Sequence, residues 1–197
     1  MAWTFYNSSG EALVNFGPVS IADGGSRLVL IGTAVASGSA DLTIPGLDST
    51  YDTYLIAISD INPATDNQTL GLRVGHSGAV DSDSTDYSYH QQKLSEGTAV
   101  YAADVSAGDD RIVLTDGIGN LAVEGVGGVL WLHRPGNGTT EPVISGHVSY
   151  VSNLGILKGG LTIGRRAAVI TLDRIQILMS SGAMDTGRLT VWGVAHA

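Results

Sequence analysis

The densest group of acidic side chains lies in the segment AVDSDSTDY, which holds Asp81, Asp83 and Asp86. Calcium is bound by several hard oxygen ligands around one point, and this segment begins with acids at the first and third positions of an EF-hand loop. It then departs from that loop, because the sixth position is Asp86 rather than Gly and the twelfth is Gln92 rather than Glu. The sequence therefore predicts a solvated Asp/Ser loop, with a weak calcium site at these three acids as the alternative.

A second acidic pair, Asp109 and Asp110, lies in the segment SAGDDR. A glycosidase with paired carboxylates needs two acids that face each other across about 5–10 Å. Adjacent residues on a strand point to opposite faces, so these two carboxylates do not converge on one substrate. The segment is interpreted as a turn.

The five histidines form no HxH or HExxH pattern, and they are His76, His90, His133, His147 and His196. If the strands around His133 and His147 pair as a hairpin, His133 lies opposite Val143 or Ile144, and His147 lies nearer Leu130. A metal shared by the two is therefore not predicted. The chain also lacks a nucleophile elbow, a P-loop and a dinucleotide fingerprint. We expect no catalytic residue, no metal and no cofactor, and hence a protein that is not an enzyme.

The composition excludes several classes of protein. The chain has 197 residues with a net charge of -9 and no Cys, and only 15% of its residues are charged. An acidic chain without a basic run argues against nucleic-acid binding. The absence of Cys excludes a disulfide framework, and no apolar run approaches the roughly 20 residues that span a bilayer.

Short apolar runs broken by turns indicate the fold. Leu70, Leu72 and Val74 alternate with Gly71 and Arg73, as in a half-buried strand. About ten such runs follow one another, and no amphipathic helical stretch is long enough for a βαβ crossover. We therefore predict an all-β domain over residues 30–197, an antiparallel β-sandwich that is jelly-roll-like. One strand is expected near Ala34–Ile44 and another at Ala168–Leu172. The pair Gly159-Gly160 lies between apolar runs and is interpreted as a turn. The expected core is Ile56, Ile58, Leu70, Leu72, Val74, Ile112, Leu114, Ile175, Ile177, Leu189 and Val191.

Residues 1–29 are expected to be an extended N-terminal attachment segment and linker. The first sixteen residues hold Trp3, Phe5, Tyr6 and Phe16 but show no sustained helical or strand period. Four exposed aromatic side chains would be an aggregation liability, and aromatic residues are enriched among interface anchors. We predict that residues 1–16 dock on another subunit or on a neighbouring copy. The alternative is that they fold back and fill an open edge of their own sandwich.

Several segments resemble structural proteins of tailed-bacteriophage virions. They are the opening MAWTFYNSSGEAL, IADGG at 21–25, GLDSTYDTYLIAISDINPATDNQTLGLRV at 46–74, STDYSYH at 84–90, and the ending IQILMSSGAMDTGRLTVWGVA. Together they cover roughly half of the chain. The resemblance implies a surface component of a phage particle, such as a short tail fibre, a spike or a capsid decoration protein.

The same resemblance implies the partners. They would be capsid or tail subunits, and fibre and decoration proteins of this kind often form homo-trimers. Nucleic acid and membrane insertion are not expected. The alternative function is a carbohydrate-binding or depolymerising module that engages a glycan on the host surface, with aromatic side chains stacking on sugars. The candidates for this stacking are Tyr87, Tyr89, Tyr101 and Tyr150. Trp131 and Trp192 lie in strands with apolar neighbours and are expected in the core or at an interface.

Overall fold

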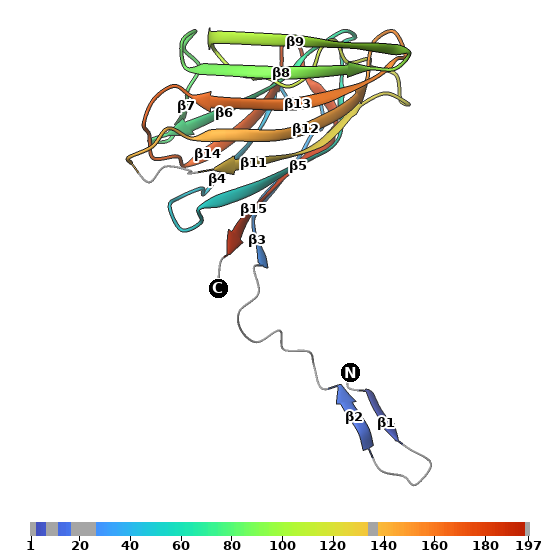
Figure 1. The fold of residues 1–197 in the computed structure, drawn as a ribbon, viewed down its shortest axis with the longest axis vertical. Coiled ribbons are helices and arrows are strands. Elements are labelled where there is room, and N and C mark those ends of the chain that lie inside the picture. Colours follow the sequence, from blue (N-terminus) through green and yellow to red (C-terminus); the bar gives the residue numbers. More distant parts are fainter. Residues whose placement is uncertain (1–2, 7–11, 17–26, 134–137, 196–197) are drawn as a thin grey trace.

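The computed structural model describes residues 3–6, 12–16, 27–133 and 138–195 (Figure 1). Every regular element in these ranges is a β-strand, and every strand pairing is antiparallel. No helix of the described residues is long and apolar enough to cross a membrane. The prediction of an all-β antiparallel chain is confirmed.

Two sheets pack face to face as a sandwich (Figure 1). The larger sheet has eight strands in the order β3-β15-β5-β11-β12-β13-β8-β9. Their bounds are Arg27–Val35 for β3, Met184–Ala195 for β15, Thr53–Pro63 for β5, Val126–His133 for β11, Val143–Val151 for β12, Leu157–Arg166 for β13, Tyr87–Ser95 for β8 and Thr98–Asp109 for β9. The smaller sheet has the order β10-β6-β14-β4, with β7 paired to β6. Its bounds are Ile112–Val113 for β10, Leu70–His76 for β6, Arg174–Met179 for β14, Asp41–Pro45 for β4 and Ala79–Val80 for β7.

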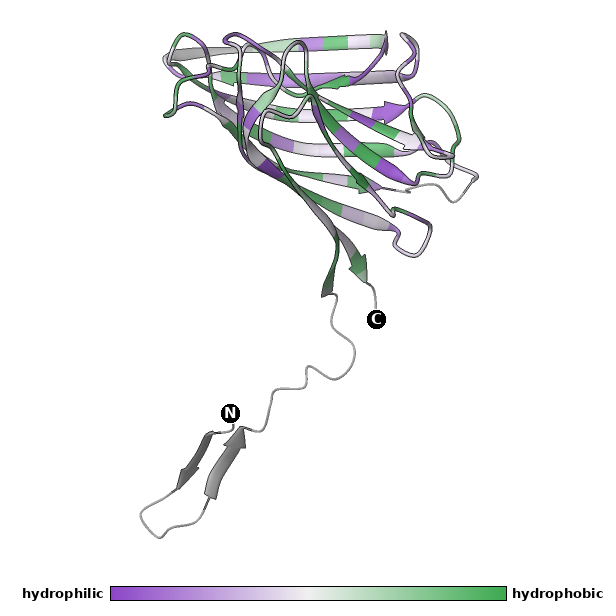
Figure 2. Cartoon of the chain, turned by 180° about the vertical axis from the view of Figure 1, so that it is seen from behind, coloured by the Kyte–Doolittle hydropathy of each residue, from purple (hydrophilic) through white to green (hydrophobic). Residues whose placement is uncertain are grey.

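The core lies between the two sheets and follows the period-two pattern of the sequence. Along β14, Ile175, Ile177 and Met179 are buried and the residues between them are half-buried. Figure 2 shows the matching alternation of hydrophobic and hydrophilic residues along the strands. All eleven residues of the predicted core are buried, none more than 3% exposed. Alternating sequence patterns therefore predicted which face of each strand turns inward.

The strand pairs are nested along the chain. In the large sheet β3 pairs with β15 and β5 with β11, while in the small sheet β4 pairs with β14 and β6 with β10. Counted from the outermost pair, β3–β15, to the innermost, β6–β10, successive pairs therefore lie alternately in the large and the small sheet. The β8–β9 and β12–β13 pairs complete the far side of the large sheet.

The first predicted strand, Ala34–Ile44, is wrong. This stretch ends one strand and begins another, because β3 stops at Val35 in the large sheet and β4 starts at Asp41 in the small one. Gly38 lies in the turn between them with a φ of 64°, a conformation that glycine adopts without the strain a Cβ would cause. The chain changes sheets at this turn.

Two further differences concern the C-terminal half. Ala168–Leu172 forms no strand, although Ile170 and Leu172 are buried. Strand β13 was not predicted, since the pair Gly159-Gly160 was interpreted as a turn and instead lies inside it. An added Cβ at Gly160 would lie 1.9 Å from the carbonyl oxygen of Gln92 on β8, so this glycine permits close approach of the two backbones.

Candidate functional site

The acidic loop of residues 81–86 binds the side chain of an arginine from another strand. Arg166, at the end of β13, donates from Nε to Asp81 Oδ2 across 2.7 Å, and its Nη2 lies 2.8 Å from Asp86 Oδ1. The side chains of Arg166, Asp81 and Asp86 are 12%, 7% and 10% exposed. Buried carboxylates are costly unless they are paired, so Arg166 supplies the positive charge that a cation would otherwise provide.

The remaining contacts of the loop are also structural. The Tyr87 hydroxyl donates to the Asp81 carbonyl and accepts from the Val74 backbone amide, at 3.0 and 2.9 Å. The second oxygen of Asp81 lies 2.9 Å from His76 Nδ1. Asp83 is exposed, and its backbone amide donates to Asp86 Oδ2 across 2.8 Å. The three acids therefore do not converge on one point as calcium ligands would.

The carboxylates of Asp109 and Asp110 also have separate partners. Asp110 forms ion pairs with Arg73 on β6 and with Arg111, while Asp109 Oδ1 accepts the backbone amide of Asp110. Burial alone would raise the pKa of Asp110, but the hydrogen bond and charge of Arg111 hold it below its usual value. The two carboxylates are not arranged to face a common substrate.

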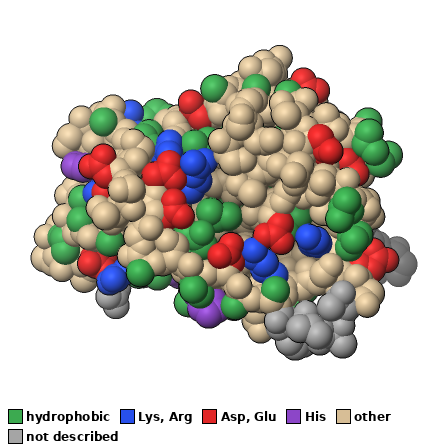
Figure 3. All heavy atoms as spheres, turned by 90° about the horizontal axis from the view of Figure 1, so that it is seen from above, with side chains coloured by type: hydrophobic (Ala, Val, Ile, Leu, Met, Phe, Trp, Pro, Cys, Tyr) green, Lys and Arg blue, Asp and Glu red, His purple; other side chains and the backbone are tan. Residues whose placement is uncertain are grey.

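A third charge cluster joins three strands and a loop. Lys93 on β8 lies 3.2 Å from Asp104 on β9 and contacts Asp116, whose other oxygen lies 3.6 Å from Lys158 on β13. Burial alone would lower the pKa of Lys93, but the hydrogen bonds and charges of Asp116 and Asp104 raise it. Figure 3, which views the molecule from above, shows acidic and basic side chains side by side in such clusters.

The outer face of the large sheet has a different composition. One row of residues, directly opposite one another in register, crosses all eight strands and is here called the central row. Its members are Leu30, Trp192, Leu55, Trp131, Ser145, Ile163, His90 and Val105. None of the eight is buried, and Leu30, Ile163 and Val105 are 59%, 50% and 63% exposed. Apolar side chains on the solvent side of a sheet are typical of a contact surface.

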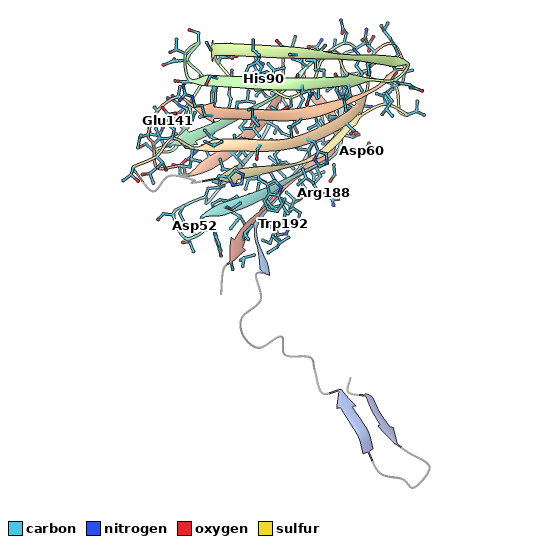
Figure 4. The ribbon with its side chains drawn as sticks, in the orientation of Figure 1. Asp52, Asp60, His90, Glu141, Arg188 and Trp192 are labelled. Carbon is cyan, nitrogen blue, oxygen red and sulfur yellow. The ribbon has the colours of Figure 1, made fainter. Side chains whose placement is uncertain are left out.

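A second row lies beside the central row on the same face. It consists of Thr33, Thr190, Ala57, Val129, His147, Leu161, Gln92 and Ala103. Neither row contains Asp or Glu, although the chain has 19 of these residues. Figure 4 places Asp52, Asp60 and Glu141 at the margins of the sheet, whereas His90 lies on it. We call the two rows together the carboxylate-free face.

Two shallow depressions flank His90 on this face. One, of about 380 Å³, is lined by His90, Gln92, Leu161 and Ile163, with Ala102 and Ala103 on β9. The other, of about 350 Å³, lies on the opposite side and includes His90, Ile163, Val143 and Arg165. The imidazole of His90 and the guanidinium of Arg165 are hydrogen-bond donors beside apolar surface, an arrangement that suits a polar ligand with an apolar side.

The histidines lie as the hairpin register predicted. His133 is opposite Val143, as expected, and His147 is opposite Val129, next to Leu130. His133 Nε2 lies 3.1 Å from Ser145 Oγ. Within the described residues no group of three His, Cys, Asp or Glu side chains is placed to hold a metal ion.

The aromatic candidates for sugar stacking separate into two groups. Tyr87 and Tyr150 are core residues, 0% and 5% exposed, and burial raises the pKa of Tyr150 to about 12. Tyr89 is half-buried, and the side chain of Tyr101 lies outside the described residues. The structure instead brings Trp131 and Trp192 into the central row, on either side of Leu55. Their apolar neighbours in sequence had indicated core or interface, and the register of three strands was needed to align them.

The four N-terminal aromatic residues lie on a β-hairpin. Strands β1, Trp3–Tyr6, and β2, Ala12–Phe16, pair antiparallel, with Trp3 opposite Phe16. Among the described strands these two pair only with each other. A segment without strand periodicity in its sequence therefore forms a two-stranded sheet of its own.

Comparison with models of known protein families found none that matches this chain, and comparison with curated proteins found no match.

Proposed function

We propose that this chain is a non-enzymatic structural protein of a tailed-phage virion surface, a short fibre, a spike or a capsid decoration. Residues 1–16 hold it in the particle by docking on a capsid or tail subunit or on a neighbouring copy. The proposal is supported by the resemblance of its sequence segments to virion proteins. It is also supported by the engagement of Asp81, Asp86 and Asp110 in ion pairs with Arg166, Arg73 and Arg111.

The observation that carries the proposal is the carboxylate-free face. A chain with a net charge of -9 repels its own copies and other acidic proteins wherever acids are exposed. The two rows across the large sheet present apolar, hydroxyl and imidazole groups in place of acids. Such a surface is suited to close contact with another protein, because little charge has to be desolvated when it is covered.

The proposal includes two finer points of architecture. We propose that the nested strand pairs form a jelly roll to which the β12–β13 pair is added, because the first and last strands pair and successive pairs alternate between sheets. We also propose that the protein is a homo-trimer, on the resemblance to fibre and decoration proteins and on its surplus of exposed apolar surface.

The experiment is to locate the protein in intact particles. Antibodies against the purified sandwich should label purified virions of the phage that encodes it, at a symmetric set of positions in electron micrographs. Deletion of residues 2–16 should abolish incorporation, while cooperative thermal unfolding shows that the truncated sandwich still folds. Antibody labelling of infected-cell lysate but not of particles would contradict the proposal.

A second candidate function is favoured by the two tryptophans of the central row. Neighbouring strands lie about 4.8 Å apart, so Trp131 and Trp192, two strands apart, are separated by about 10 Å on one face. Sugar rings stack on such indoles, and His90 and Arg165 would supply hydrogen bonds. This function is a carbohydrate-binding or depolymerising module directed at a glycan of the host surface.

The second function is tested with host polysaccharide. Trp131→Ala should abolish retention of the protein on immobilised polysaccharide, while Leu154→Ala, at an exposed side chain in the loop between β12 and β13, serves as the control and should be retained. Equal retention of the wild type and of Trp131→Ala would exclude a sugar site at this row. Release of oligosaccharides would identify a depolymerase.

A further inference from the structure

The free edges of the two sheets differ in how they are protected. A strand at a sheet edge exposes unpaired N–H and C=O groups, and proteins block such edges with charges, proline or very short strands. In the small sheet β7 and β10 have two residues each, and β4 has five residues bounded by Asp41 and Pro45. In the large sheet the β9 edge carries Asp104 and Asp109.

The edge strand β3 has none of these devices. It is nine residues long and reads RLVLIGTAV, so that it lacks charge and proline after Arg27. Leu28, Leu30 and Val35 are 50%, 59% and 62% exposed. Among the described strands β3 pairs with β15 alone. An unprotected apolar edge of this length is suited to receive another strand.

The N-terminal hairpin has the complementary property. An isolated two-stranded hairpin is at best marginally stable in water and needs a further strand or a packing partner. Strands β1 and β2 read WTFY and ALVNF and contain no charged residue. Among the described strands they pair only with each other, and none pairs with the free edge of β3.

We propose that the β3 edge receives the β1–β2 hairpin of a neighbouring copy, which extends the large sheet across the boundary between two chains. This inference rests on the attachment role proposed for residues 1–16 and names the surface that receives them. Both strands at the contact are free of acids, so two chains of net charge -9 can approach each other there. Residues 17–26 join the hairpin to β3, and these ten residues span at most about 35 Å, enough to reach an adjacent domain.

The geometry of such a contact also bears on the assembly. The hairpin and the β3 edge are different surfaces, so each contact between them is heterologous. A heterologous contact closes into a ring when its rotation permits, and a ring of three agrees with the proposed trimer. Direct pairing of β3 with β3 of a second copy would instead give an isologous dimer.

Cysteine crosslinking tests the proposal without background, because the chain contains no Cys. One tagged chain carries Thr4→Cys on β1 or Asn15→Cys on β2, and an untagged chain carries Thr33→Cys on the exposed side of β3. After unfolding and refolding together, the chains are treated with a short bis-maleimide reagent. We expect a mixed crosslinked species of one tagged and one untagged chain. Val105→Cys on the β9 edge replaces Thr33→Cys as the control and should give none.

Each other outcome overturns the proposal. A chain with both Asn15→Cys and Thr33→Cys that crosslinks only within itself shows that the hairpin fills its own edge. Crosslinking of Thr33→Cys to itself shows pairing of two β3 strands. No crosslink from either hairpin position shows that β3 does not receive the hairpin. These results are obtained in solution and are therefore independent of whether the protein enters virions.

A second measurement uses light scattering of the full chain. Leu30→Lys adds a charge to the β3 edge at a side chain that is 59% exposed, so the sandwich should fold and lose its oligomers. Leu154→Lys, at a side chain that is 72% exposed in the loop between β12 and β13 and outside the carboxylate-free face, is the control and should leave the oligomers intact. Unchanged oligomers in Leu30→Lys would overturn the proposal.

Discussion

Arg166 and Asp81 lie 85 positions apart in the sequence and are joined by a hydrogen bond of 2.7 Å from Nε to Oδ2. This contact ties the end of β13 in the large sheet to the loop that follows β7 in the small sheet. A single guanidinium thus fixes one end of the sandwich across both sheets, and it does so by neutralising Asp81 and Asp86 together.

Removal of this guanidinium should destabilise the fold strongly. Arg166→Ala leaves two carboxylates buried without their partner, and we expect a loss of about 3–5 kcal/mol in the free energy of unfolding. The neighbouring Arg165→Ala is the control, because Arg165 is 52% exposed and its pair with Glu141 should contribute less than about 1 kcal/mol. Urea unfolding followed by tryptophan fluorescence measures both. Equal effects would show that Arg166 has no special role.

Calcium should not stabilise the protein. The carboxylates of Asp81 and Asp86 are engaged by Arg166, and Asp83 directs only its backbone into the loop. Bound calcium would raise the melting temperature in proportion to its affinity for the folded state. We expect the same melting temperature in calcium chloride and in magnesium chloride of equal ionic strength. A rise specific to calcium that Asp83→Asn abolishes would establish the alternative of a weak site.

The contacts between Arg166 and the acidic segment 81–86 could not be predicted from the sequence. The acidic cluster was visible in the segment 81–86, but its partner Arg166 lies in a strand that the sequence did not predict, since Gly159-Gly160 was interpreted as a turn. The central row could not be predicted from the sequence for a similar reason. Alternation predicts which side of a strand faces the core, whereas the register between strands decides which exposed side chains meet.

The strands of the N-terminal hairpin also could not be predicted from the sequence pattern. Residues 1–16 carry no period-two pattern because a two-stranded hairpin has no sheet behind it to select one buried face. The inward side of the sandwich, by contrast, was predicted correctly at all eleven core positions. Periodic patterns arise where burial is one-sided, as it is along the strands of the sandwich.

Alkaline pH should destabilise the sandwich over a defined range. Burial raises the pKa of Tyr54 and of Tyr150 to about 12, from an ordinary value of 10.0. A folded-state pKa above the unfolded value contributes stability that is complete below pH 10 and is lost as the pH rises towards 12. We expect the melting temperature to fall across this interval, together with the appearance of tyrosinate absorbance.

The matched variants for the alkaline prediction are Tyr54→Phe and Tyr150→Phe. Each removes one ionisable hydroxyl and should therefore reduce the slope of melting temperature against pH above pH 10. Tyr54→Phe should also lower stability at neutral pH, because the Tyr54 hydroxyl accepts the Asp48 amide at 2.9 Å and donates to its carbonyl at 3.0 Å. A slope that is unchanged in both variants would show that other groups govern alkaline unfolding.

Leu130 and Trp131 test the assignment of the two faces of the large sheet. They are adjacent on β11, and Leu130 is 0% exposed whereas Trp131 is 38% exposed. Leu130→Ala leaves a cavity between the sheets, and we expect a loss of about 2–5 kcal/mol in the free energy of unfolding. Trp131→Ala removes a larger side chain but leaves no enclosed cavity, so its cost should be smaller than that of Leu130→Ala. Thermal unfolding of the two variants would decide the point, since a larger cost for Trp131→Ala would place the indole in the core. If Trp131→Ala keeps the fold as expected, the variant also separates the two proposed functions. Loss of polysaccharide binding with normal particle incorporation would assign the central row to a glycan rather than to a protein partner.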